Sequence, residues 1–171
     1  MHGRCRCPAV TRLPCPDLPD QIPASVPGCV HTDLLSASLI PDPYLDENEL
    51  ALAWVGHQQW RYRTSFMLSA NEIADSEGTE LVCLGLDTVA AVLVNGVAVG
   101  RTSNQHRVHR FPVASLLREG DNTIEVVFDD AWPHAESLRD ELGPLPNAYP
   151  APFNFIRKMA CNFGWDWGQR W

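Results

Sequence analysis

The sequence predicts an all-β protein, built as an antiparallel β-sandwich. Segments that alternate apolar and polar residues recur at short intervals, turn-forming residues separate them, and little of the chain has helical periodicity. The chain has 171 residues, of which 45% are hydrophobic and 20% are charged. It is therefore long enough to bury a core of its own, and its composition is that of a globular protein.

The expected strands follow one another from residue 60 onward. Residues 60–68, Trp-Arg-Tyr-Arg-Thr-Ser-Phe-Met-Leu, alternate large apolar and polar side chains as a half-buried strand does. Asn95 and Gly96 stand between two apolar runs and predict a tight hairpin, because both residue types tolerate positive φ. In all, we expect strands at residues 60–68, 80–84, 89–94, 97–99, 106–111 and 123–128.

Only short helices are expected. Residues 31–39 have apolar side chains near helical spacing, Thr32 or Asp33 is a suitable N-cap, and two prolines follow the segment. We expect one helical turn within residues 113–122. A short exposed helix is expected at residues 135–142, where a Gly-Pro pair ends it.

The first 25 residues differ from the rest of the chain. They are rich in Pro, Cys and Arg and have no periodic pattern, so we expect a disordered or atypical leader at residues 1–25 and a β-sandwich domain at residues 26–171. The leader contains basic residues but no continuous apolar segment, and therefore does not have the pattern of a signal peptide. On this basis we expect a cytoplasmic location.

The composition argues against several classes of function. A net charge of −8 argues against nucleic acid as a partner, since phosphate binding requires clustered Lys and Arg. No apolar run approaches the roughly 20 residues needed to span a bilayer, so no membrane partner is expected. Cys5 and Cys7 stand too close for the usual zinc-ligand spacing, and no glycine-rich phosphate loop is present. We therefore expect no metal site and no cofactor, and we interpret Cys83, in an apolar run, as a buried free thiol.

The segment from Cys161 to Trp171 has the most unusual composition in the chain. It contains three tryptophans and one carboxylate within seven residues, Trp165 to Trp171. Indole rings stack on the C–H faces of a sugar, and a carboxylate such as Asp166 accepts hydrogen bonds from sugar hydroxyls. The alternative is an apolar core strand with glycine turns, which composition alone favours because most tryptophans are core residues.

The acidic residues form no convincing catalytic pair. Glycoside hydrolysis requires two carboxyl groups that face one bond, and we interpret the adjacent acidic residues as solvated surface pairs. These pairs are Asp46-Glu47, Asp129-Asp130 and Asp140-Glu141. Two Asn-Glu pairs have the form of a glycosidase acid/base motif, but no barrel strand leads into Asn48-Glu49 or Asn71-Glu72, and we reject both. No nucleophile motif of the Gly-x-Ser-x-Gly type is present. We therefore assign no catalytic residue.

Several motifs together resemble the N-terminal region of the β-mannosidase branch of glycoside hydrolase family 2. The resemblance extends over about residues 26–168 and keeps the order of the motifs. The motifs are Val26-Pro-Gly-Cys-Val-His-Thr-Asp-Leu-Leu35, Leu39-Ile-Pro-Asp-Pro-Tyr44, Asp46-Glu-Asn-Glu49, Trp60-Arg-Tyr-Arg-Thr64, Gly85-Leu-Asp-Thr-Val-Ala90, Leu93-Val-Asn-Gly96, Asn154-Phe-Ile-Arg-Lys158 and Cys161-Asn-Phe-Gly-Trp-Asp-Trp-Gly168.

This resemblance implies a jelly-roll sandwich of the galactose-binding-domain type. Enzymes of the family continue with an immunoglobulin-like domain and a (β/α)8 barrel that carries both catalytic glutamates. A Trp-Asp-Trp loop of the first domain reaches into the active site and holds the mannose. The match implies that Asp166 accepts hydrogen bonds from sugar hydroxyls, that Trp165 forms a wall of the subsite, and that Trp167 is a packing residue.

The chain departs from the family pattern at both ends. The family opens with a Trp-containing strand where this chain has its Cys- and Pro-rich leader, and it continues with Trp-Gly-Pro where this chain has Gln169-Arg170-Trp171. A sandwich without its first and last strands exposes sheet edges, which invite association. We therefore expect a jelly roll that is incomplete at both ends.

Three interpretations of function remain at this point. The first is the N-terminal domain or a fragment of a retaining β-mannosidase, an enzyme that hydrolyses terminal non-reducing β-D-mannose residues. This chain would be inactive alone, because the barrel that it needs as a partner is absent. The second is a stand-alone carbohydrate-binding or interaction domain without catalysis. The third is a truncated gene product without function.

Overall fold

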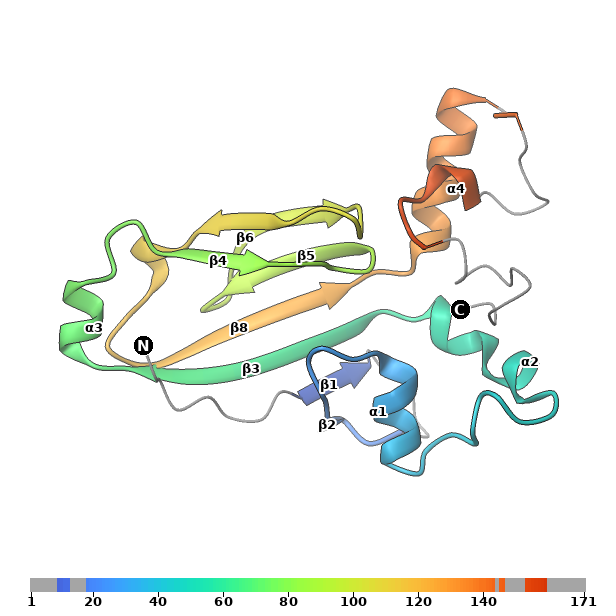
Figure 1. Cartoon of the computed structure of the whole chain (residues 1–171), viewed down its shortest axis with the longest axis horizontal. Helices are drawn as coiled ribbons and strands as arrows, with labels where there is room; N and C mark the ends of the chain where they lie inside the picture. Colours follow the sequence, from blue (N-terminus) through green and yellow to red (C-terminus); the bar gives the residue numbers. More distant parts are fainter. Residues whose placement is uncertain (1–8, 13–17, 144, 147–152, 160–171) are drawn as a thin grey trace.

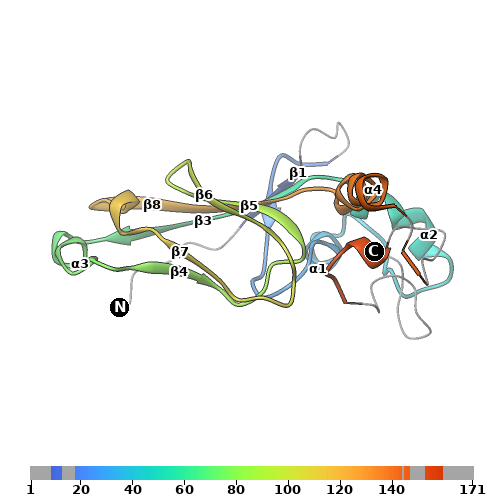
Figure 2. The same ribbon diagram turned by 90° about the horizontal axis from the view of Figure 1, so that it is seen from above.

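The protein is an elongated two-layer β structure with most of its helices at one end (Figures 1 and 2). The computed structural model describes residues 9–12, 18–143, 145–146 and 153–159. One layer is a six-stranded sheet with the order β2-β1-β3-β8-β5-β6, and the other is the pair β4-β7. All strand pairs are antiparallel. The strands are β1 (Ala9–Arg12), β2 (Ile22–Pro23), β3 (Trp60–Leu68), β4 (Glu80–Cys83), β5 (Val89–Val94), β6 (Val97–Ser103), β7 (His109–Pro112) and β8 (Gly120–Phe128).

Strands β3 and β8 pair along their whole length and form the centre of the large sheet. The register joins Trp60 to Phe128 at one end and Leu68 to Gly120 at the other. Because side chains alternate along a strand, Tyr62 lies on the same face as Trp60, whereas Arg61 points to the opposite face. The Nη1 atom of Arg61 lies 3.4 Å from a carboxylate oxygen of Glu125. The sequence alternation therefore separates an apolar inner face from a polar outer face.

The core of the sandwich lies between the two layers. Val92 and Val94 of β5 are fully buried and belong to one cluster with Phe111 of β7. Gly100 of β6 lies directly beneath the Phe111 ring, and a Cβ atom at this glycine would stand 2.3 Å from Cε1 of the ring. The layers therefore approach so closely at this point that only glycine fits.

The β5–β6 hairpin turns at Asn95 and Gly96, which have φ angles of 51° and 79°. The Asn95 amide also donates hydrogen bonds to the Leu116 carbonyl at 2.7 Å and to Oδ1 of Asn122 at 2.8 Å. Asn122 is completely buried, and its own amide donates to the carbonyls of Arg118 and Gly120. The predicted hairpin is thus confirmed, and its first turn residue also joins the hairpin to β8.

Helices gather at the two ends of the long axis (Figures 1 and 2). α3 (Ala70–Ala74) lies at one end, while α1, α2 and α4 lie at the other. A second apolar core fills the helical end, and it includes Leu34, Leu52, Val55 and Trp60. The elements of that end are α1 (Val30–Ser36), α2 (Asn48–Leu52), η1 (Ala53–His57), α4 (Ala131–Leu142) and η3 (Phe153–Phe155).

All six strands expected from the sequence are present, as is the helix expected after residue 30. The last helix is longer than expected. It begins at Ala131, because a carboxylate oxygen of Asp130 accepts a hydrogen bond from the Trp132 N–H and caps the first turn.

The structure also contains two strands within residues 1–25, the segment interpreted above as a leader. β1 pairs with β3, and β2 pairs with β1, so this segment contributes to the edge of the large sheet. β1 has four residues and β2 has two, which is too short for an alternating pattern to reveal a strand.

Replacing Asn122 should destabilise the protein strongly. Asn122→Ala removes a fully buried side chain and leaves its four hydrogen-bond partners unmatched, and we expect the free energy of unfolding to fall by about 3 kcal/mol in urea denaturation. Asn71→Ala is the matched control, because Asn71 is exposed on α3 and its loss should change stability by about 0.5 kcal/mol or less. Equal losses in the two variants would contradict the role of this network.

Candidate functional site

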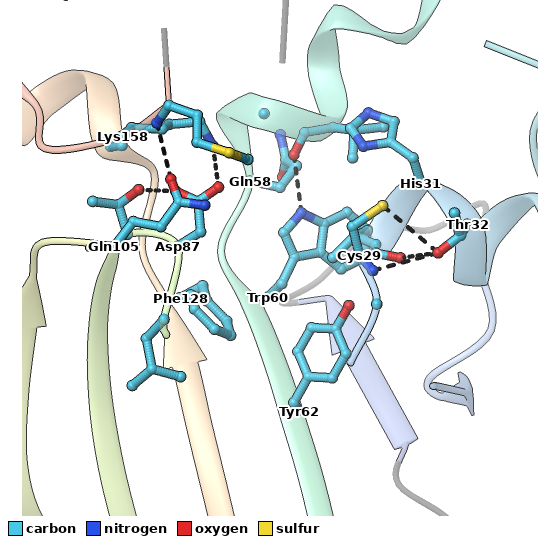
Figure 3. A pocket seen from close by; sticks show the side chains of 18 of the residues that line it. Cys29, His31, Thr32, Gln58, Trp60, Tyr62, Asp87, Gln105, Phe128 and Lys158 are labelled. Atoms are coloured by element: carbon cyan, nitrogen blue, oxygen red, sulfur yellow. Dashed lines mark hydrogen bonds and ion pairs between the residues drawn. The ribbon is translucent and has the colours of Figure 1, made fainter. Parts of the chain in front are cut away.

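A cavity of about 760 Å³ opens at the helical end of the molecule. The loop before α1, the ends of β3 and β8, the loop before β5, and the segment after η3 enclose it (Figure 3). Segments from across the chain therefore meet here, with aromatic residues from the sheet on one side and charged residues from the loops on another. The lining residues used below are His31, Val55, Trp60, Tyr62, Asp87, Gln105, Phe128, Asp129, Trp132, Ile156, Lys158 and Met159.

Aromatic side chains of the central strand pair form one wall of the cavity. Tyr62 and Phe128 meet edge to face, with ring centroids 5.8 Å apart and an interplanar angle of 86°. The Tyr62 hydroxyl donates a 3.0 Å hydrogen bond to Oδ2 of Asp33, which is itself buried. Burial, with the Asp33 carboxylate beside the hydroxyl, raises the pKa of Tyr62 far above its usual value. Tyr62 is therefore a neutral hydrogen-bond donor to Asp33 near pH 7.

An ion pair spans the opposite side of the cavity. The Lys158 ammonium lies 2.8 Å from Oδ2 of Asp87, and the two side chains are 16% and 30% exposed. Figure 3 shows this pair beside Gln105, whose side-chain oxygen accepts a 2.9 Å hydrogen bond from the Met159 N–H. Two motifs far apart in the sequence, Gly85-Leu-Asp-Thr and Phe-Ile-Arg-Lys158, are thus brought into contact.

His31 is the titratable group of the cavity with the largest lowering of its pKa. Burial in the cavity wall, and to a smaller extent the positive charge of Lys158, lower the pKa of His31 from 6.5 to about 4. The imidazole is therefore neutral near pH 7 and cannot supply a cation there.

The polar groups of the cavity are largely engaged within the chain. The Trp60 indole N–H donates to the Val55 carbonyl at 2.9 Å, and Tyr62 donates to Asp33. Lys158 and Asp87 neutralise each other. From the described lining residues, a ligand would therefore meet mostly apolar and aromatic surface, and it would gain few new polar contacts from them.

One acidic pair expected at the surface has a structural role instead. Asp129 and Asp130 are both half-buried. Asp129 accepts a hydrogen bond from Gln59 at 2.6 Å and one from Arg101 at 2.7 Å, while Asp130 caps α4. The expectation of a solvated pair was wrong here. These residues lie between β8 and α4, where Gln59, Arg101 and the first turn of α4 contact them.

The other two acidic pairs, and the Glu72 side chain, lie outside the cavity. The pairs Asp46-Glu47 and Asp140-Glu141 are exposed, as expected. Glu72 accepts a hydrogen bond from the Ser69 N–H at 2.9 Å and closes a capping box on α3, at the end of the molecule opposite the cavity. Glu72 therefore serves as a helix-capping residue, far from the cavity.

The two substrate-contact residues expected from the sequence, Trp165 and Asp166, lie outside the described residues. Sequence reasoning did not assign a role to Lys158 or Asp87, although both lie in quoted motifs. The sequence did contain a signal for this pair, because one of those motifs carries a negative charge at Asp87 and another carries a positive charge at Lys158. Cys83 is a free thiol that is only half-buried, and its partial burial raises its pKa.

The described part of the chain contains neither a metal-ligand cluster nor a helix that could span a membrane. Residues 9–12, 18–143, 145–146 and 153–159 contain no group of three or more His, Cys, Asp or Glu side chains placed to hold a metal ion. In the same residues, no helix is both long enough and apolar enough to cross a membrane.

The chain can now be compared with known proteins. Over residues 13–171 it matches the family described as glycosyl hydrolase 2 galactose-binding domain-like. The chain belongs to this family. The β-mannosidase of Capra hircus is 38% identical over 157 residues, a match that covers 86% of this chain and 18% of the relative. β-Mannosidase B of Thermothelomyces thermophilus is 35% identical over 161 residues, covering 89% of this chain and 18% of the relative.

Solved structures give the same assignment of the fold. A β-D-mannosidase from Dictyoglomus thermophilum superposes with a TM-score of 0.81 at 32% identity, covering 99% of this chain and 21% of that one. An exo-chitosanase from Amycolatopsis orientalis, at 19% identity and a TM-score of 0.60, shares the fold over 75% of this chain and 17% of its own. The predicted jelly-roll class and the predicted family are therefore confirmed, and the chain spans about a fifth of the length of these relatives.

Acid should weaken the fold through His31. The folded protein holds its pKa at about 4, below the ordinary 6.5, so the unfolded chain takes up the proton first as the pH falls. The stabilisation from the neutral imidazole is complete above about pH 6.5 and is lost as the pH drops towards about 4. Allowing for the partial exposure of His31, we expect its size to be on the order of 2 kcal/mol.

Urea denaturation at about pH 7 and about pH 4 measures this effect. The His31→Gln variant should lose less stability between the two pH values than the parent protein does. His106→Gln is the control for replacement of a histidine, because His106 is exposed and its replacement should change stability by about 0.5 kcal/mol or less. An identical loss in the parent and in His31→Gln would exclude His31 as the source.

Proposed function

We propose that this chain is the N-terminal sugar-binding domain of a retaining β-mannosidase, which hydrolyses terminal non-reducing β-D-mannose residues. The observation that carries the proposal is the similarity to β-mannosidases over nearly the whole chain, at 38% identity over 157 residues for the goat enzyme. The TM-score of 0.81 to a bacterial β-D-mannosidase supports it from the structure.

In this proposal the domain binds the sugar and a barrel domain on the same polypeptide performs the hydrolysis. Asp166 accepts hydrogen bonds from hydroxyls of the mannose, and Trp165 stacks against the sugar ring. Hydrogen bonds to a charged acceptor contribute roughly 1.5–3 kcal/mol each, which is enough to orient a monosaccharide. The partners of the domain are thus a β-mannoside and the catalytic barrel.

The carboxylates around the described cavity support a division of labour between domains. Retaining hydrolysis requires a nucleophilic carboxylate and an acid/base carboxyl about 5–5.5 Å apart. Among the described lining residues, Asp87 and Asp129 carry carboxylates. Asp87 is paired with Lys158 and Asp129 with Arg101. Both are engaged in ion pairs within this domain, and the proposal therefore places the reacting pair in the barrel.

The 171-residue chain by itself should not hydrolyse an aryl β-mannoside, because the proposed catalytic carboxylates belong to another domain. Release of the chromophore should stay at the background rate of buffer. Titration calorimetry with mannose should give a dissociation constant above about 1 mM, since the proposed subsite is complete only with the barrel. Turnover by the purified chain would overturn the proposal. Tight mannose binding without turnover would favour a stand-alone carbohydrate-binding domain instead.

In the full-length enzyme, Asp166→Ala should lower kcat/KM by an amount equivalent to about 2–4 kcal/mol, because hydrogen bonds that strengthen in the transition state are lost. Steady-state kinetics with an aryl β-mannoside measures this. Asp140→Ala is the matched control, since Asp140 is exposed on α4 and should leave kcat/KM unchanged. If the two variants have the same activity as the parent, Asp166 does not contact the substrate.

A further inference from the structure

The segment that leads into residues 160–171 is fixed at several independent points. Its first part, η3, packs on α4, where Phe155 and Ile156 form a small buried cluster with Ala135. The Phe153 ring meets the Trp132 ring at a centroid distance of 5.4 Å and an angle of 65°. Hydrophobic packing therefore anchors the beginning of the segment to the helical end of the molecule.

The second set of contacts is made by main-chain atoms. Arg157 forms a parallel β-bridge with Asn104, and its carbonyl accepts a 2.9 Å hydrogen bond from the Gln105 N–H. The side-chain oxygen of Gln105 then accepts a 2.9 Å hydrogen bond from the Met159 N–H. The turn after β6 thus holds the segment from both sides of Lys158.

The third contact is the ion pair of Lys158 with Asp87. It joins the segment to the loop before β5, and Figure 3 shows both partners on the same side of the cavity. With side chains 16% and 30% exposed, the pair is screened less by solvent than a surface pair. Removing one partner leaves a poorly solvated charge on the other, and this cost keeps the two side chains together.

We propose that Lys158, Asp87 and Gln105 are positioning residues for the sugar contact assigned to Trp165 and Asp166. This inference rests on the proposed function. Met159 is the last described tethered residue, six positions before Trp165, and six residues span at most roughly 20 Å. Without the tethers at 157–159, the last packed residue among those described is Ile156, nine positions before Trp165, and nine residues span at most roughly 30 Å.

The longer reach raises the upper limit on the volume in which the contact residues can be placed about threefold, and residues 157–159 no longer set the direction of the chain that follows them. Orientation matters more than volume for a catalytic contact, because a misplacement of about 1 Å can lower a rate about a hundredfold. We therefore expect kcat/KM to fall by about tenfold to a hundredfold when the ion pair is broken, with most of the change in kcat.

The first experiment uses the 171-residue chain and limited trypsin digestion. Asp87→Asn should raise the rate of cleavage after Arg157 and Lys158 at least tenfold, whereas cleavage after Arg63, in the middle of β3, should not change. A general loss of stability would accelerate cleavage at all of these bonds, so the ratio separates local release from unfolding. An unchanged ratio would show that the ion pair does not hold the segment, and the inference would fail.

Matched variants complete the digestion experiment. Glu80→Gln removes a different ion pair, between Glu80 and Arg110 on β4 and β7, and should leave the cleavage ratio unchanged. If Asp87→Asn does not fold, Gln105→Ala tests the same segment, because it removes the acceptor of the Met159 N–H without leaving a buried charge. Gln105→Ala should also raise the ratio, and failure to do so would count against the inference.

Kinetics of the full-length enzyme provide the second test. Lys158→Met should lower kcat about tenfold or more with a smaller change in KM, while Lys158→Arg, which keeps the charge, should recover most of the activity. Asp166→Ala measured beside them separates the two proposals. If Asp166→Ala impairs the enzyme and Lys158→Met does not, the positioning role alone is overturned; if neither variant has an effect, the sugar contact and its positioning both fall.

Discussion

The register between β3 and β8 is the constraint on which the rest of the structure depends. The two strands pair over nine residues each, and β1 and β5 extend the sheet from their outer edges. This register places Trp60, Tyr62 and Phe128 together on the inner face at the helical end, where they line the cavity. A slip of one residue would turn Arg61 inward and Tyr62 outward, since the side-chain period of a strand is two. The cavity therefore exists only because the register is fixed.

The fold was largely predictable because its central strands carry a strong local signal, but two kinds of element were not. The strict alternation of residues 60–68 and the Asn95-Gly96 pair are local patterns, and the structure places a strand and a hairpin where they predict them. β1 pairs with β3, and β2 pairs with β1. These pairings stabilise the two short strands, which have no sequence pattern of their own. α3 was missed although Ser69 and Glu72 have the spacing of a capping box, a signal that was available in the sequence.

The candidate site was harder to predict than the fold, because its contacts join residues far apart in the chain. Lys158 and Asp87 are separated by 71 positions, and nothing in either local sequence says that the two side chains meet. Asp129 was expected in solvent, yet it is held by Arg101 of β6, which lies two strands away from β8 in the sheet. Motif resemblance identified the segments of importance. Only the folded arrangement shows which side chains in those segments pair, since long-range ion pairs depend on the packing of the whole sheet.

The chemistry of the cavity suits a domain that supplies position rather than reaction. A catalytic carboxylate must change its charge or form a bond during turnover, and a salt bridge to a neighbouring cation opposes both changes. The described cavity holds its carboxylates in salt bridges and its phenol as a fixed donor to Asp33. Those same contacts are what rigid support requires, because a side chain with a fixed partner cannot drift during binding. The features that make Asp87 and Lys158 unsuitable as catalysts are therefore the ones that make them suitable for holding the segment that precedes Trp165 and Asp166.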